Sequence, residues 1–304
     1  MKILVTGASG FVGSAIATAL SAEGHRVIGT GRSTPGWIAP PGSSYVYWDL
    51  FSEPPKVSPD AVVHCAALVS DQMALAAALR ANRDGTLAVR RSFPDAQMIH
   101  ISSSSVYDSF RSHHFTPESE GPGRNLAGAY ARSKASAELV LGPFPETVIL
   151  RPHAVYGPGD RTLLPRIEAA LRGNVLLLPN GGRARHSLTH IDNLIAAVRC
   201  ALFGSVSGSF NITDAEPVQL AEAMIDLLAR RRRRITVRSV PYRLAQGLGG
   251  AAEAMGAILG PREGSLSRYA VAQLAFEHSY QLSAAKQQLG YRPKPTSFLG
   301  AEHW

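Results

Sequence analysis

The chain has 304 residues, of which 45% are hydrophobic and 18% charged, and a formal net charge of +8 at pH 7. This length fits one large α/β domain, or one domain with a smaller appendage, and the composition suits a globular protein with a sizeable core. Two cysteines, Cys65 and Cys200, provide neither a disulfide framework nor the ligand spacing of a metal site. No signal peptide and no apolar run of transmembrane length is apparent, so we expect a cytoplasmic protein without membrane contact.

The densest source of positive charge is a run of five arginines at residues 230–234. No aromatic side chain is interleaved with it, and no nucleic-acid-binding motif accompanies it. Cations suit the carboxyl end of a helix, where the backbone carbonyls carry partial negative charge. We therefore interpret the run as a solvated helix end and predict no nucleic-acid partner.

Apolar, strand-like runs alternate with helical patterns along the first half of the chain. The predicted strands cover residues 3–5, 26–29, 61–65, 97–101 and 147–150, and the predicted helices include 14–23 and 73–92. This alternation indicates an α/β fold with a parallel sheet that helices cover on both faces, as in doubly wound proteins. Such sheets bind ligands at the carboxyl ends of their strands.

The texture of the sequence changes after about residue 157, where proline and glycine become frequent. Helical patterns cover residues 163–172, 191–203 and 220–234, and residues 237–240 could form a further strand. We predict two interleaved parts: a sheet domain over residues 1–160, joined by strands returning from the later chain, and a smaller, mainly helical C-terminal lobe over residues 161–304.

Three glycines, Gly7, Gly10 and Gly13, follow the first predicted strand and open the first predicted helix. Glycine lets the backbone turn tightly and approach a pyrophosphate, whose charge is then stabilised by the amino end of the helix. The position of the triplet therefore predicts a dinucleotide site of the Rossmann type.

Tyr130 and Lys134 are four residues apart, so on a helix they lie on one face, a single turn from each other. A phenol titrates near pH ~10, and a neighbouring cation favours its phenolate, which is the form that accepts a proton. The pattern alone is weak. Its position after the glycine loop and after four consecutive serines at residues 102–105 makes it specific.

The G-x-x-G-x-x-G spacing together with Y-x-x-x-K resembles the extended short-chain dehydrogenase/reductase superfamily, and the resemblance covers nearly the whole chain. His64-x-Ala66-Ala67, the N-x-x-G-T motif that begins at Asn82, and the R-P-x-x-x-Y-G-P-G motif that begins at Arg151 match its pattern. The R-P-H form of the last motif is most similar to the 3-beta-hydroxysteroid dehydrogenase branch, which includes beta-keto acid reductases. The resemblance implies that the cofactor is bound by Gly7, Ser9, Gly10, Phe11, Val12, Gly13, Arg32, Asp49, Leu50, Cys65, Ala66, Ala67, Asn82, Tyr130, Lys134, Pro152, His153 and Val155.

The same resemblance implies the catalytic residues. Ser103 stands four residues before Tyr107, at the family's catalytic hydroxyl, and is expected to act with Tyr130 and Lys134. Tyr130 would exchange a proton with the substrate oxygen, and Ser103 would hydrogen-bond that oxygen. The substrate is expected to meet Ser104, Ser105, Tyr156, Arg183 and His186. No metal site is expected.

The end of the second predicted strand bears on the choice of cofactor. NAD-binding members of the family carry an acidic residue there for the ribose hydroxyls, whereas this chain has Gly31 and then Arg32. A guanidinium can pair with a 2′-phosphate through two hydrogen bonds. We therefore favour NADP(H), with NAD(H) as the alternative.

Three functions fit these motifs. The first is an oxidoreductase that interconverts a ketone and a secondary alcohol of a small-molecule substrate by hydride transfer. The second is a nucleotide-sugar 4-epimerase or dehydratase with tightly bound NAD, although Ser104 and Ser105 occupy the place of a dehydratase's Asp-Glu pair. The third is a catalytically idle NADP-binding protein, against which the intact Ser103, Tyr130 and Lys134 argue. A homodimer is common in this family.

Overall fold

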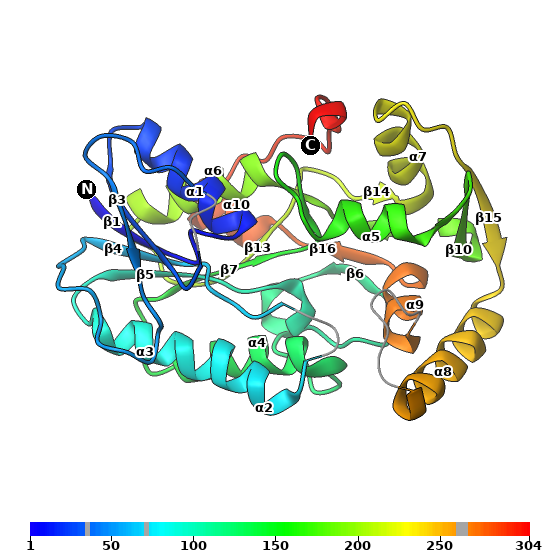
Figure 1. The fold of residues 1–304 in the computed structure, drawn as a ribbon, viewed down its shortest axis with the longest axis horizontal. Helices are drawn as coiled ribbons and strands as arrows, with labels where there is room; N and C mark the ends of the chain where they lie inside the picture. The colour runs from blue at the N-terminus through cyan, green and yellow to red at the C-terminus, as the bar shows by residue number, and fades with distance from the viewer. Residues whose placement is uncertain (34–36, 70–72, 260–266) are drawn as a thin grey trace.

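A computed structural model describes residues 1–33, 37–69, 73–259 and 267–304 of the chain (Figure 1). Seven parallel strands form its central sheet in the order β13-β7-β5-β4-β1-β2-β3. The strands are β1 (Lys2–Thr6), β2 (Arg26–Gly31), β3 (Ser44–Tyr47), β4 (Ala61–His64), β5 (Gln97–Ile101), β7 (Val148–Pro152) and β13 (Gly208–Ile212). Because the order reverses between β1 and β4, the sheet has the topological switch point of a Rossmann-type doubly wound fold, which confirms the predicted fold class.

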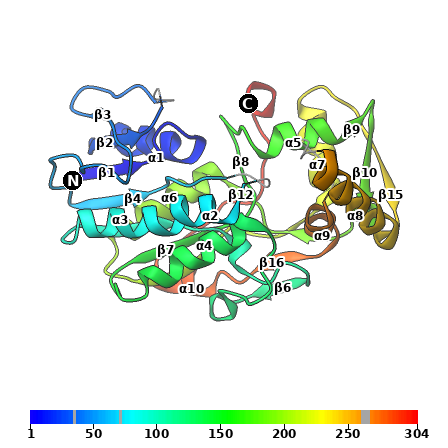
Figure 2. The ribbon, with the colours of Figure 1, turned by 60° about the horizontal axis from the view of Figure 1, so that its bottom comes forward.

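The core is divided by the alternation of side chains along each strand. Ile3 and Val5 of β1 pack with helices α1 (Phe11–Ala22) and α6 (Ile191–Phe203), whereas Leu4 packs on the opposite face with α3 (Gly85–Ser92). Figure 1 shows α1 and α6 on one side of the sheet, and Figure 2 shows α2 (Leu75–Ala78), α3 and α4 (Gly128–Leu141) along the other. Strands buried on both faces are expected for a parallel sheet covered by helices.

Three elements in and beside the central sheet differ from the sequence-based prediction. The single helix predicted over residues 73–92 is interrupted by a π-helical turn, Leu79–Asp84, between α2 and α3. Strands β3 and β13 were not predicted, because β3 is a half-exposed edge strand and β13 carries a buried Asn211 among its apolar residues. Such a polar residue is tolerated inside only when the fold supplies hydrogen-bond partners.

The later chain forms a lobe of helices and two small sheets. Its helices are α5 (Leu163–Ala170), α7 (Leu220–Arg230), α8 (Tyr242–Leu259) and α9 (Arg268–Ala275), and α10 (Ser283–Gln288) returns to the central sheet. One small sheet joins β9 (Leu171–Arg172), β10 (Val175–Pro179) and β15 (Thr236–Val240), and the other joins β14 (Val218–Gln219), β11 (Arg185–His186), β16 (His278–Tyr280) and β6 (His113–Thr116). A further pair is β8 (Val155–Tyr156) with β12 (Thr189–His190).

The arginine run lies at a helix end, as predicted, but it is not wholly solvated. Arg230 is the last residue of α7, and the guanidinium of Arg231 donates hydrogen bonds to the carbonyls of Ala301 and Trp304. The run therefore helps to hold the C-terminal tail. Among the residues that the structure describes, no helix combines the length and apolarity needed to cross a bilayer.

Three histidines form a row across the second small sheet. His186 is the register partner of His278, and His278 is the partner of His113, so the three rings share one face. Their centroids are 5.2 and 5.6 Å apart, and His153 stacks on His278 at 5.3 Å. The Nε2 atoms of His186 and His278 are buried without a hydrogen-bond partner. Burial lowers the pKa of His186 to about 3, so the ring is neutral at pH 7.

These histidines make the fold sensitive to acid. Burial also lowers the pKa of His64 to about 3. An unfolded histidine binds its proton near pH 6.5, so between pH 6.5 and 3 the unfolded chain binds more protons and stability falls as the pH falls. We predict that His186→Asn reduces the slope of the unfolding free energy by up to about 1.4 kcal/mol per pH unit between pH ~6 and ~4. Urea unfolding at a series of pH values measures this slope.

The matched control is His303→Asn, whose side chain is 84% exposed and lies outside the row. If His186→Asn and His303→Asn gave the same slope as the wild type, the histidine row would not be a source of acid sensitivity.

Candidate active site

The glycine loop connects β1 to α1 at the carboxyl end of the sheet. Gly7 has a φ of +70°, and a Cβ there would lie 2.8 Å from the Cα of Ala66, so this position excludes other residues. Gly10 is the N-cap of α1, and no side chain caps the helix there. The first turn of α1 carries no acidic side chain. The amino end of α1 is therefore open to an anion. The predicted phosphate-binding residues Ser9, Phe11, Val12 and Gly13 all belong to this loop or to the first turn of α1.

Asn82 connects Leu68, the residue after the predicted cofactor segment at residues 65–67, to the helix that carries Tyr130. The Asn82 side chain is 1% exposed; its Oδ1 accepts from the Leu68 N–H at 2.7 Å, and its Nδ2 donates to the Leu68 carbonyl at 3.1 Å. The Nδ2 also donates to the Ser133 hydroxyl at 2.8 Å, and Ser133 donates to the Tyr130 carbonyl.

Burial raises the pKa of Cys65 to about 12, so this thiol stays protonated and unreactive.

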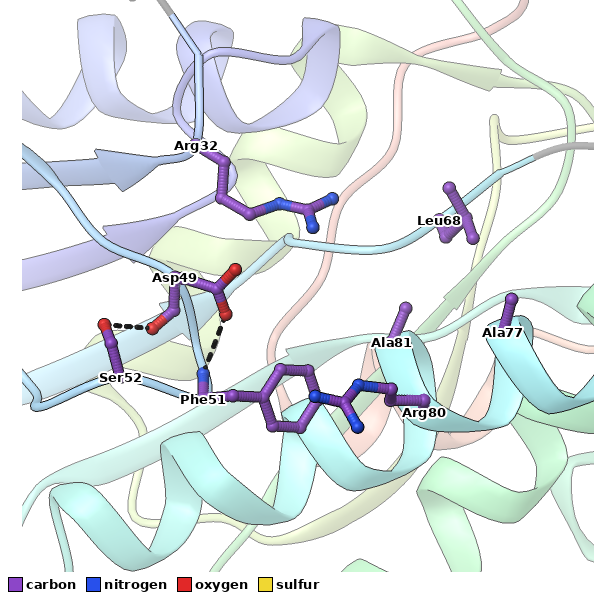
Figure 3. Close-up of a pocket in the computed structure, with 8 residues that line it drawn as sticks. All are labelled: Arg32, Asp49, Phe51, Ser52, Leu68, Ala77, Arg80 and Ala81. Carbon is purple, nitrogen blue, oxygen red and sulfur yellow. Dashed lines mark hydrogen bonds between the residues drawn. The ribbon is translucent and has the colours of Figure 1, made fainter.

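A cavity of about 410 Å³ lies beyond the ends of β2 and β3 (Figure 3). Asp49 accepts a hydrogen bond from the Phe51 N–H at 3.0 Å, and the guanidinium of Arg80 lies 4.5 Å from the centroid of the Phe51 ring. Figure 3 shows Arg32 on the wall opposite Phe51 and Arg80. The cavity is lined by Arg32, Asp49, Phe51, Ser52, Leu68, Ala77, Arg80 and Ala81.

The cavity contains two predicted cofactor residues and two that sequence reasoning missed. Arg32 and Asp49 line it, as expected of residues that meet the adenosine half of a dinucleotide. Leu50 instead packs with the core on the α3 side of the sheet. Phe51 and Arg80 were not predicted, because only the fold brings the π-helical turn against the segment that follows β3.

Lys134 lies beneath the end of β5. Its side chain is 3% exposed, and its Nζ donates to the Ile101 carbonyl at 2.7 Å, immediately before the serines. Burial lowers the pKa of Lys134 to about 8, an effect that the nearby Cys65 and Glu138 oppose. The ammonium therefore remains largely protonated at pH 7, with two N–H groups beyond the one that bonds Ile101.

Ser103 begins the short 3₁₀ turn Ser104–Val106, against which α4 packs. Its hydroxyl oxygen accepts a hydrogen bond from the Ser105 N–H at 3.1 Å. Tyr130 is half-buried on α4, one turn before Lys134. The structure therefore gathers the three predicted catalytic residues on two adjoining elements, the serine turn and α4.

A buried ion pair fixes α4 to the sheet. Arg151 of β7 donates to both carboxylate oxygens of Glu138 on α4, at 3.0 and 2.7 Å, and both side chains are at most 4% exposed. Ser102 donates to the same carboxylate at 2.5 Å. Burial alone would lower the pKa of Arg151, but the charge and hydrogen bonds of Glu138 raise it above its ordinary value.

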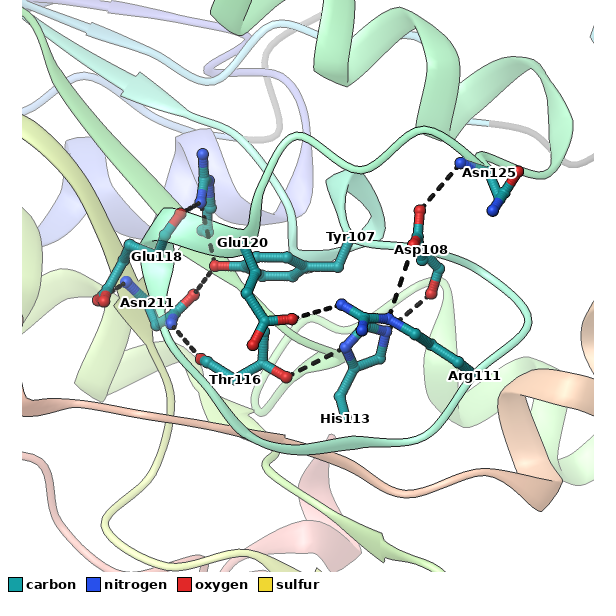
Figure 4. A network of polar contacts seen from close by, with 10 residues as sticks. Tyr107, Asp108, Arg111, His113, Thr116, Glu118, Glu120, Asn125 and Asn211 are labelled. Carbon is teal, nitrogen blue, oxygen red and sulfur yellow. Dashed lines mark hydrogen bonds and ion pairs between the residues drawn. The ribbon is translucent and has the colours of Figure 1, made fainter.

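The network continues from Arg151 into the segment that follows the serines (Figure 4). Arg151 donates to the Tyr107 hydroxyl at 3.0 Å, and Tyr107 donates to Asn211 of β13 at 2.7 Å. Farther out, His113 bonds the Asp108 carbonyl, and Arg111 pairs with Glu120. The carboxylate of Asp108, the residue after Tyr107, accepts from the Asn125 N–H at 2.9 Å.

Two predicted substrate residues point into the protein. Ser104 is 4% exposed, and its hydroxyl bonds Nδ1 of His153 at 2.7 Å. Tyr156 is 1% exposed and donates to Asp214 at 2.7 Å. Each hydroxyl therefore has a hydrogen-bond partner inside the fold, and a contact of Ser104 or Tyr156 with a substrate stays a prediction.

The other predicted residues take varied positions. Ser105 has a buried hydroxyl without a hydrogen-bond partner. Arg183 is exposed, and His186 belongs to the histidine row. The predicted cofactor residue Pro152 ends β7 and is buried, and Val155 is half-buried in β8. Among the described residues, no group of three or more histidine, cysteine or acidic side chains is arranged to hold a metal ion.

The Glu138–Arg151 pair predicts a large effect on stability. Replacing Glu138 by Gln leaves the buried guanidinium without a counter-charge, so we expect a loss of about 3–5 kcal/mol in the free energy of unfolding. Urea unfolding measures it. The exposed pair Arg230–Asp226 supplies the control, because Asp226→Asn is expected to cost at most about 1 kcal/mol. Equal effects of the two substitutions would contradict the structural role assigned to Glu138.

Comparisons with known proteins agree with this geometry. Residues 3–213 match the model of the NAD dependent epimerase/dehydratase family. The chain is 31% identical to the uncharacterized protein YbjS of Escherichia coli (strain K12), covering 99% of this chain and 96% of that protein. It is 30% identical to the 2-alkyl-3-oxoalkanoate reductase of Stenotrophomonas maltophilia, covering 97% and 95%.

The fold is also that of a solved epimerase. The UDP-glucuronic acid 4-epimerase of Bacillus cereus, in complex with NAD, superposes with a TM-score of 0.73 at 21% identity over 100% of this chain and 97% of that one. The family match over two thirds of the sequence and the full-length similarity to a reductase lead to one conclusion. The chain belongs to the NAD dependent epimerase/dehydratase family of extended short-chain dehydrogenase/reductase enzymes.

Proposed function

We propose that this protein is an NADP(H)-dependent reductase that interconverts a ketone and a secondary alcohol of a small molecule. The cofactor would supply the hydride, and Ser103, Tyr130 and Lys134 would handle the substrate oxygen. The 2-alkyl-3-oxoalkanoate reductase that resembles this chain along its length supports a ketone as substrate. A homodimer and a cytoplasmic location stay predictions of the sequence.

The hydrogen bonds of the site suit proton transfer to a carbonyl oxygen. Because the Ser103 oxygen already accepts from the Ser105 N–H, its own O–H is left to donate to the substrate. Tyr130 would donate the proton that the new alcohol requires, and the buried ammonium of Lys134 would stabilise the phenolate that remains. In the oxidative direction the same groups act in reverse.

The comparisons favour reduction over the epimerase alternative. The 2-alkyl-3-oxoalkanoate reductase is 30% identical over 97% of this chain, whereas the UDP-glucuronic acid 4-epimerase is 21% identical and shares the fold. The full-length similarity to a reductase is the observation that carries the proposal.

A panel of substrates tests the reaction. The purified protein is mixed with NADPH and a series of ketones, including 3-oxo acids, or with UDP-sugars, and absorbance at the reduced nicotinamide band is followed. We expect steady consumption of NADPH with a ketone, and a loss of at least about 100-fold in kcat for Tyr130→Phe because the proton donor is removed. Tyr47→Phe, on the exposed edge strand β3, is the control and should retain full activity.

Sugar interconversion without net consumption of cofactor would instead support the epimerase. Full activity of Tyr130→Phe would show that the proposed acid–base chemistry is wrong.

The cofactor preference has a separate test. Arg32 lines the cavity beyond the ends of β2 and β3, which we call the adenosine cavity. Arg32→Asp replaces its cation by a carboxylate, which repels a 2′-phosphate. We therefore expect the ratio of kcat/KM for NADPH to that for NADH to fall about tenfold or more. Arg26→Asp, at the exposed opposite end of β2, is the matched control. An unchanged ratio in Arg32→Asp would overturn the assignment of NADP(H).

A further inference from the structure

Position 31, at the end of β2, has no room for a side chain. A Cβ built on Gly31 would lie 2.6 Å from the hydroxyl oxygen of Tyr45 and 2.8 Å from that of Ser9. Real Cβ atoms do not approach other atoms this closely, so one neighbour would have to move. The Ser9 hydroxyl can rotate about a single bond. The Tyr45 hydroxyl cannot, because it ends a rigid ring that packs against the core.

Tyr45 reaches this position from the neighbouring strand. It lies in β3, which pairs in parallel with β2, and its backbone register partner is Gly29. Its ring extends from there along the sheet, so the hydroxyl stands beside Gly31, where the glycine loop and β2 come together. In NAD-binding relatives this is the place of the carboxylate that binds the ribose hydroxyls.

Tyr45 also holds the turn that carries Arg32. Its hydroxyl donates to the Ser33 carbonyl at 2.8 Å. Arg32 lies between Gly31, which Tyr45 contacts, and Ser33, which Tyr45 bonds, and the Arg32 side chain lines the adenosine cavity (Figure 3). A residue fixed on both sides loses less conformational freedom when its guanidinium pairs with a phosphate.

We propose that Tyr45 is a determinant of cofactor specificity: its hydroxyl fills the space that a carboxylate at position 31 would need, and it fixes the 31–33 turn so that Arg32 faces the 2′-phosphate of NADP(H). This inference rests on the proposed preference for NADP(H). It explains why the preference involves β3, a strand that sequence motifs of the cofactor site do not include.

The test uses two nucleotide fragments, adenosine 2′,5′-bisphosphate and 5′-AMP, which differ only in the 2′-phosphate and need no identified substrate. Their affinities are measured by isothermal titration calorimetry, with thermal unfolding to verify that each variant is folded. The wild type should bind the bisphosphate about tenfold or more tightly than 5′-AMP. Tyr45→Phe should weaken binding of the bisphosphate about three- to tenfold through loss of the Ser33 hydrogen bond, with 5′-AMP little changed.

A double substitution tests the steric part. Gly31→Asp alone should weaken both fragments, because Tyr45 occupies the required space. Combining it with Tyr45→Phe should restore 5′-AMP binding about tenfold or more relative to Gly31→Asp, since the ribose hydroxyls then meet a carboxylate, while the bisphosphate stays weak. Tyr47→Phe is the matched control: Tyr47 is on the same strand, 70% exposed, and its combination with Gly31→Asp should give no rescue.

The outcomes separate the two proposals. A wild type without preference for the bisphosphate would overturn the assignment of NADP(H), while rescue in the double variant would still support the steric role of Tyr45. If the wild type prefers the bisphosphate, two results would overturn the role of Tyr45. One is equal 5′-AMP binding by Gly31→Asp and the double variant, and the other is an unchanged preference in Tyr45→Phe. A Gly31→Asp variant that unfolds and regains its fold with Tyr45→Phe counts as support.

Discussion

The placement of α4, the helix that carries Tyr130 and Lys134, depends on the buried ion pair between Glu138 and Arg151. Removing two charges from water is costly, and the cost is offset only if every hydrogen-bonding group finds a partner in good geometry. Here Arg151 bonds Glu138, Tyr107 and the Glu118 carbonyl, and Glu138 also accepts from Ser102. These partners come from a strand, a helix and the serine segment, so none of the three can slide without leaving a buried charge exposed to apolar surroundings. Lys134, one turn before Glu138, is thereby held under the end of β5.

A second, uncharged link, through the side chain of Asn82, holds the end of α4 that carries Tyr130. Asn82 sits in a π-helical turn and ties the Leu68 backbone to Ser133, which in turn bonds the Tyr130 carbonyl. The helix with the tyrosine is thus attached to the sheet at one end by charge and to the cofactor segment at the other by an amide. The proposed acid–base role of Tyr130 and Lys134 requires preorganisation of this kind.

Much of the fold could be predicted because the signal is local: the apolar runs of the strands and the helix patterns between them each extend over a short stretch of sequence. The glycine loop and the Tyr130–Lys134 spacing were readable for the same reason. The inward hydrogen bonds of Ser104 and Tyr156 could not be predicted because their partners, His153 and Asp214, are 49 and 58 residues away in the sequence. The positions of Phe51 and Arg80 follow only from the packing of a helical turn on a loop, and that of Tyr45 from the pairing of β3 with β2, and no motif encodes either.

The exchange of strands between the two parts of the chain has a consequence for how the protein is made. The edge of β7 acquires its neighbour only when residues 208–212 exist, and β6, at residues 113–116, pairs with β16 at residues 278–280. During synthesis β7 therefore has an open edge until residue 212 has been made, and β6 until residue 280 has been made. Open edges of this kind are templates for pairing with other chains. Long-range contacts of this kind form slowly, because the chain loses the conformational entropy of the intervening loop before the contacts stabilise the structure. The nascent chain therefore exposes these edges for longer than a chain whose strands pair only with near neighbours in the sequence.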